Sequence, residues 1–121
     1  MKENNVVKEK SLDFSLRIIN MSKYLFDKLS FSEKTIITQI IKSGTSIGAN
    51  VFEAEYAESK DDFKHKLKIS LKEANETKYW LTLLFRCDYL SKEQYNSLIV
   101  DCEELIKLLT SIINKINNNQ D

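Results

Sequence analysis

The chain of 121 residues carries 18 basic and 18 acidic side chains, one histidine, two cysteines, two glycines and no proline. Its zero formal net charge excludes a general electrostatic attraction to nucleic acid or to membranes. One histidine is too few for a di-iron bundle site, which takes two Glu-x-x-His motifs. The shortage of helix breakers favours an all-α fold in a single domain.

The first 30 residues are expected to form one helix, preceded by a polar segment. Residues 1–10 are polar with weak periodicity, and they predict a flexible N-terminus. A helix is then predicted from about Ser11 to Leu29, with Ser11 as its N-cap. Its broad apolar face contains Leu12, Leu16, Ile19, Tyr24, Phe26 and Leu29.

The second predicted helix starts near Glu33, and it raises a question at residues 43–48, Ser-Gly-Thr-Ser-Ile-Gly. Glycines and small polar residues are typical of a loop, yet Ile47 and Val51 continue the helical period across the segment. In a continuous helix each glycine costs about 1 kcal/mol relative to alanine. Gly44 and Gly48 would then share one face, where another backbone could approach closely. We favour the continuous helix.

Two serines predict the starts of the last two helices. Ser59, followed by acidic residues in the first turn, begins a third helix that runs to about Asp88. Ser91 and Gln94 form a capping-box pattern at the start of a fourth helix that runs to Ile116. Residues 117–121 predict a flexible tail. Four amphipathic helices joined by short turns predict an antiparallel up-down-up-down four-helix bundle over residues 11–116.

The sequence shows no catalytic constellation. No spacing of serine, cysteine and histidine indicates a nucleophilic triad, and Cys87 and Cys102 lack the spacing of a metal motif. Both cysteines are expected to be buried thiols in a reducing compartment. We therefore predict that the protein is not an enzyme and needs no metal or cofactor.

The N-terminus and the apolar runs indicate the compartment. The N-terminus lacks the apolar core of a signal peptide, and no apolar run reaches the roughly 20 residues that cross a bilayer. We expect a cytoplasmic protein with no membrane partner.

Four polar residues lie near apolar positions of the second and third helices: Asn50, Glu53, Glu73 and Glu76. Buried polar groups need partners, since an unsatisfied one costs about 1–3 kcal/mol. We interpret them as a structural polar network that clamps the second helix to the third, or one subunit to the next. The alternative is a ligand or acid–base site.

Lysines recur along the third helix. Lys60, Lys64, Lys68 and Lys72 are four residues apart, and Lys66 lies beside them. One interpretation is a solvated face, or one paired with Glu53, Glu55 and Glu58. The other is a set of contacts to a phosphate backbone, repeated around an oligomer so that weak contacts gain avidity.

The third helix also has more apolar surface than one bundle seam can cover. Tyr79, Trp80, Leu83 and Phe85 account for this excess. Packing in the core is one interpretation of these side chains, and a contact between subunits is the other.

Several segments together resemble a known family. They are the run from Lys42 to Ala54, Ala57-Glu58-Ser59, Asp62-Phe63 with His65-Lys66-Leu67, and Leu71 to Leu81. This pattern resembles the four-helix bundle family named for ribosomal RNA intervening-sequence proteins, which includes the accessory proteins of diversity-generating retroelements. Lys42 stands where the family commonly has arginine.

The resemblance implies a second helix that is continuous through both glycines, and a homopentameric barrel. The retroelement accessory proteins of this family bind nucleic acid through a basic surface and have a reverse transcriptase as partner, so the resemblance also implies contact with nucleic acid or with a protein that handles it. We expect a non-enzymatic homo-oligomeric scaffold or adaptor that contacts RNA or DNA through the lysines. The alternatives are an adaptor for a protein partner with no nucleic-acid role, and a carboxylate-based ligand or metal site.

Overall fold

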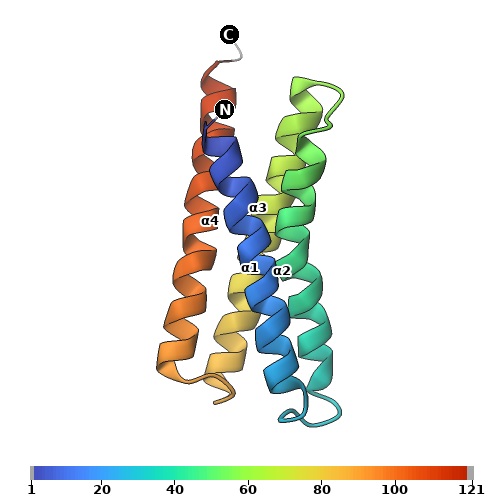
Figure 1. Cartoon of the computed structure of the whole chain (residues 1–121), viewed down its shortest axis with the longest axis vertical. Helices are drawn as coiled ribbons and strands as arrows, with labels where there is room; N and C mark the ends of the chain where they lie inside the picture. Colours follow the sequence, from blue (N-terminus) through green and yellow to red (C-terminus); the bar gives the residue numbers. More distant parts are fainter. Residues whose placement is uncertain (1, 120–121) are drawn as a thin grey trace.

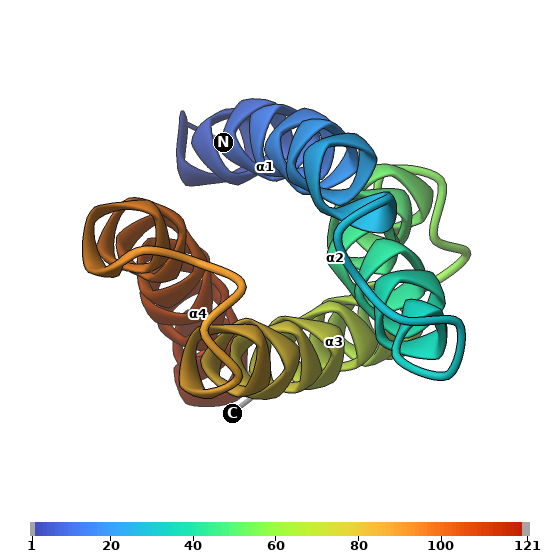
Figure 2. The ribbon, with the colours of Figure 1, turned by 90° about the horizontal axis from the view of Figure 1, so that it is seen from below.

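Four long helices form the whole of the computed structural model, which describes residues 2–119. They are α1 (Lys2–Phe26), α2 (Lys34–Ala54), α3 (Lys60–Arg86) and α4 (Lys92–Asn118). Each helix runs antiparallel to the one before it, and the ends of the chain lie together with the α2–α3 turn (Figure 1). Seen end-on, the helices follow one another around a common interior (Figure 2). The predicted up-down-up-down bundle is confirmed.

The core is made by one apolar face of each helix. Its largest completely buried side chains recur at helical spacing and include Phe14, Ile18, Leu25, Ile40, Ile47, Leu67, Leu81, Leu84, Leu105, Leu109 and Ile112. Burial of such a side chain contributes about 1.5–3 kcal/mol relative to exposure. The helices therefore owe their stability mainly to packing.

Serine side chains define two of the helix starts, as predicted. Ser59 accepts a hydrogen bond of 3.1 Å from the backbone N–H of Asp62 at the start of α3. Ser91 and Gln94 form a full capping box at the start of α4, with reciprocal bonds of 3.1 and 2.9 Å. Each bond satisfies a backbone N–H that has no partner inside the helix.

The prediction of a flexible start at residues 1–10 is wrong for the described part, because α1 begins at Lys2. Val7 is buried in the core, and the Glu3 carboxylate pairs with Lys115 and accepts from Ser111. These partners come from the other end of the chain, so local sequence does not reveal them. At the C-terminus α4 continues through Asn118, and the predicted tail at residues 120 and 121 lies outside the described residues.

The helix α2 is continuous through residues 43–48, as predicted, and neither glycine has a positive φ. A Cβ atom added to Gly48 would lie 3.3 Å from the backbone oxygen of Ser11 in α1. One added to Gly44 would lie 3.0 Å from two side-chain carbons of Ile18. The two glycines therefore let α1 lie close to α2, against backbone at one position and a side chain at the other.

Small polar side chains join α2 to α3 within the core. The Ser70 hydroxyl donates to the Ile47 carbonyl oxygen at 2.8 Å, and the Thr77 hydroxyl donates to Ser43 at 2.9 Å. Ser43, Ser70 and Thr77 are all completely buried. Since these hydroxyls are short and satisfied, they let the two helices approach without leaving a polar group unpaired.

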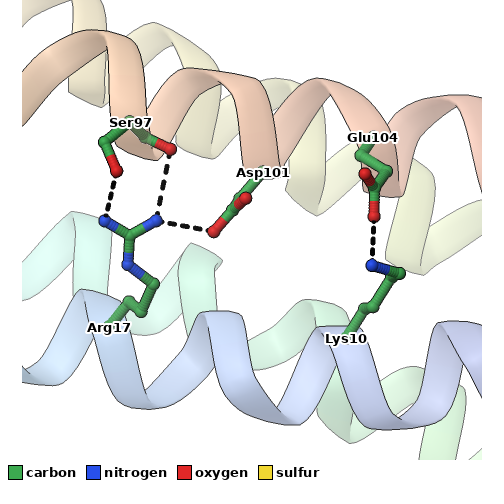
Figure 3. Close-up of polar contacts among 5 residues, drawn as sticks. All are labelled: Lys10, Arg17, Ser97, Asp101 and Glu104. Atoms are coloured by element: carbon green, nitrogen blue, oxygen red, sulfur yellow. Dashed lines mark hydrogen bonds and ion pairs between the residues drawn. The ribbon is translucent and has the colours of Figure 1, made fainter.

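The seam between α1 and α4 is closed by charged groups. Arg17 donates to the Asp101 carboxylate at 2.6 Å and to both the backbone oxygen and the hydroxyl of Ser97, while Lys10 pairs with Glu104 (Figure 3). All four charged side chains are more than a third exposed. Such pairs contribute about 0–1 kcal/mol each, so they set the position of α1 more than they stabilise it.

The close approach at Gly44 predicts a specific cost for added volume. Gly44→Val should lower the free energy of unfolding by about 1–3 kcal/mol, because its methyl groups must displace Ile18 in a filled core. Urea unfolding followed by circular dichroism measures the loss. Thr38→Val is the matched control, since Thr38 is exposed on the same helix and stays β-branched. Equal stability of the two variants would contradict the close packing.

The two cysteines should react differently with thiol reagents. Cys102 is buried, donates to the Ala74 carbonyl oxygen at 3.2 Å, and has a pKa raised by burial to about 12. Cys87 is exposed, which corrects the expectation that both thiols are buried. At pH 8 a disulfide reagent should therefore modify one thiol per native chain and the second only on unfolding. Two fast equivalents on the native protein would contradict this structure.

Candidate functional site

Large apolar side chains are exposed along one side of α1 and α2. Leu12 and Leu16 lie one turn apart on α1 and are 62% and 53% exposed. Phe52 lies in the last turn of α2 and Tyr56 in the turn that follows the helix; they are 52% and 71% exposed, and their ring centroids are 5.4 Å apart. Contiguous exposed apolar side chains of this size usually mark a contact surface.

Between these helices lies a groove of about 450 Å³, which we call the α1–α2 groove. Its floor is made by the small residues Thr45, Gly48 and Ala49, and Leu12 and Phe52 flank it. The groove stays open because α2 is helical across residues 43–48 and places Thr45, Gly48 and Ala49, which are all small, along this seam.

The sequence pattern found these apolar residues on α1 but assigned them to the wrong side. Leu12 and Leu16 were placed on the broad apolar face of the helix, whereas Phe14 and Ile18 are the buried apolar residues at this level of α1. The helix has two apolar stripes, and periodicity alone does not show which one faces inward.

Two neighbouring aromatic side chains of α3 form an edge-to-face pair, of which Tyr79 is exposed and Trp80 packs partly against the core. Their ring centroids are 5.0 Å apart. The Trp80 indole N–H donates to the Glu76 carboxylate at 3.2 Å. By contrast, Phe85 stacks on Tyr95 of α4 at 4.4 Å and so belongs to the bundle itself.

The structure does not bring Asn50, Glu53, Glu73 and Glu76 into one network. Asn50 donates to a backbone oxygen of its own helix, Glu53 pairs with Lys66 at 3.4 Å, and Glu76 accepts from the Trp80 indole. Within residues 2–119 no hydrogen bond joins any two of the four. Among these four residues only Glu53, through its pair with Lys66, joins α2 to α3, so the structure does not show the predicted clamp of all four within the chain.

Glu73 is the member of this group with a shifted pKa. Partial burial raises the pKa of its carboxyl, and the nearby charge of Glu76 adds to the effect, while Lys42 and Lys72 act against it.

Within residues 2–119 no group of three or more histidine, cysteine, aspartate or glutamate side chains is arranged to hold a metal ion.

The candidate lysines separate into two sets. Lys66 lies on the side of α3 that faces α2 and pairs with Glu53. Lys60, Lys64, Lys68 and Lys72 follow one another over three turns of the other side, about 18 Å of helix. None of these four forms an ion pair with another described residue. The interpretation in which glutamates of the preceding helix pair with these lysines holds for Lys66, which pairs with Glu53. Glu55 pairs with Lys8 of α1 instead.

None of the helices in the described part of the chain is both long and apolar enough to cross a bilayer. The charged residues of α1 and α4 pair across their seam, so they present no strong field of one sign there.

Comparison with known proteins agrees with the resemblance seen in the sequence. The profile of the 23S rRNA-intervening sequence protein family matches residues 3–111. A solved structure from Bacteroides thetaiotaomicron, described as a protein of unknown function from the S23 ribosomal protein family, is 53% identical to this chain. The two superpose with a TM-score of 0.86 over 93% of this chain and 98% of the other. A search of curated proteins finds no match.

Proposed function

Because this chain belongs to the 23S rRNA-intervening sequence protein family, we propose that it is a non-enzymatic homo-oligomeric scaffold whose subunits associate through the α1–α2 groove. The observation that carries the proposal is the set of four large side chains, Leu12, Leu16, Phe52 and Tyr56, each more than half exposed in the single chain. A second copy that covers them removes apolar surface from water, which is the main driving force of most protein association.

A ring is the assembly that these surfaces support best. A closed ring uses heterologous contacts, so each subunit needs two different and complementary patches. The chain presents two: the α1–α2 groove with its exposed rim, and the pair Tyr79 and Trp80 on α3. Aromatic side chains are favoured anchors of such contacts. The family resemblance implies five copies, and two distinct patches per subunit support that assembly.

The mass in solution tests the assembly. A pentamer has a mass of about 70 kDa, five times the 14.1 kDa of one chain. The double variant Leu12→Asp with Phe52→Asp should shift the protein to 14.1 kDa in light scattering after gel filtration, because both charges would be buried in the contact.

The matched control is Val100→Asp, since Val100 is 58% exposed on α4, away from the groove. This variant should keep the mass of the unaltered protein, and circular dichroism should show unchanged helix content in both variants. A wild-type protein that is monomeric at all concentrations would contradict the proposal, as would a double variant that keeps the assembled mass.

A second proposed role concerns nucleic acid, and the row of four lysines without ion-pair partners favours it. Phosphates bind lysine as a point charge, and copies of the row around a ring would act together on one strand. The neutral chain gives no general attraction to nucleic acid, so binding would depend on this row. The family's reference to an intervening sequence of 23S rRNA agrees with such a role.

Charge reversal tests this role directly. At about 50 mM salt the triple variant Lys64→Glu, Lys68→Glu, Lys72→Glu should bind a labelled single-stranded RNA at least ~10-fold more weakly than the unaltered protein. Fluorescence anisotropy measures the affinity, and affinity should fall as salt rises.

The control reverses Lys23, Lys92 and Lys107, which are exposed on other helices and give the same change in net charge. It should keep most of the affinity. Equal losses in both variants, or no binding at low salt, would remove the nucleic-acid role and leave a scaffold for protein partners alone.

A further inference from the structure

A cavity is lined by residues near one end of the bundle, including Asn4, Ala57 and Asn119. This is the end at which α1 begins, α4 ends and the α2–α3 turn lies (Figure 1). It encloses about 800 Å³ and takes its walls from all four helices. The interior wall is apolar and includes Val51, Leu67, Ile112 and Ile116. A cavity of this size and lining is typical of sites for small organic molecules.

Of the charged residues that line the cavity, Glu55 and Lys115 form ion pairs and Lys60 forms none with a described residue. Glu55, the only carboxylate among the lining residues that the structure describes, pairs with Lys8 at 3.0 Å. Lys115 pairs with Glu3. Lys60 remains as the one charged lining residue that forms no ion pair with any residue in 2–119. Lys60 therefore offers an unpaired ammonium above an apolar wall, while its sequence neighbours Glu58, Asp61 and Asp62 add negative charge outside the lining.

Lys60 lies at the N-terminus of a helix. It is the first residue of α3, directly after the N-cap Ser59, which also lines the cavity. The partial positive charge of the helix N-terminus acts at this point, and Asp61 and Asp62 of the same turn act against it. The side-chain amides of Asn4 and Asn119, both in the lining, offer N–H donors near the same opening.

From this arrangement we propose that the cavity binds an amphipathic organic anion, with its aliphatic or aromatic body against the apolar wall and its carboxylate at Lys60. The complementarity of both parts defines the chemical class: a small anion without an apolar body leaves the wall unfilled, and an apolar cation places like charge beside Lys60. The site is separate from the α1–α2 groove and from the lysine row beyond Lys60.

The probe is decanoate, with acetate and decyltrimethylammonium as comparisons, titrated into the full-length protein by calorimetry. Decanoate should bind saturably, with one molecule per chain. Acetate lacks the apolar body and decyltrimethylammonium carries the opposite charge, so neither should bind measurably at the same concentrations. Equal binding of decanoate and decyltrimethylammonium would overturn the proposal, as would unsaturable binding or no binding of decanoate.

Two variants locate the site. Lys60→Glu should weaken decanoate at least ~10-fold, and it should fold, because an acidic residue suits the first turn of a helix. Lys92→Glu is the matched control: Lys92 is likewise the first residue of its helix after a serine N-cap, at α4, and its reversal should leave the affinity unchanged. Ala57→Trp, in the α2–α3 turn, should fill the cavity and abolish binding.

The remaining outcomes also decide the question. Wild-type affinity in Ala57→Trp, with an unchanged melting temperature, would place decanoate elsewhere and overturn the proposal. If a second copy of the chain covers the cavity, decanoate should fail to bind the assembled protein but should bind the monomeric variant Leu12→Asp, Phe52→Asp. That result would reassign the cavity to the subunit contact and overturn its role as a ligand site.

Discussion

The close approach of α1 to α2 at Gly44 and Gly48 is the constraint on which the rest of the structure depends. A helix with two interior glycines loses about 1 kcal/mol at each relative to alanine, so the loss must be offset elsewhere. The offset is the packing of Ile18 and of the Ser11 backbone against positions with no side chain. Since α2 stays helical through this segment, its opposite side can meet α3 through Ser70 and Thr77.

The same constraint produces the exposed surface. With α2 continuous, the residues next to the glycines, Thr45 and Ala49, turn outward between Leu12 and Phe52. They are small, so the seam between the helices stays open as a groove. A break at residues 43–48 would separate the two halves of α2 and remove the groove. The feature that costs helix stability is therefore the one that shapes the proposed subunit contact.

Much of the fold could be predicted from the sequence because its signals are local. Ser59 and Ser91 cap helices through residues three positions away, and the period of Ile47 and Val51 carries α2 across its glycines. The start of α1 could not be predicted in this way, because Glu3 pairs with Lys115 at the far end of the chain. Contacts of that kind depend on the fold rather than on neighbouring residues.

The candidate sites were less predictable, because they depend on how each helix is rotated about its axis. Asn50 and Glu53 were grouped by sequence position, yet one bonds within its own helix and the other pairs with Lys66. The buried hydroxyls of Ser70 and Thr77 do join two helices, and in the sequence these residues fall at the helical spacing of Leu67 and Leu81. A short polar side chain at a core position was thus a better signal than a carboxylate beside one.

Amide hydrogen exchange along α2 tests the central claim most directly. If the helix is continuous and held by α1 on one side and α3 on the other, the amides of residues 43–48 should exchange as slowly as those of the turns before and after them, with protection near that of the global unfolding reaction. Fast exchange confined to residues 43–48, between two protected halves, would contradict the account.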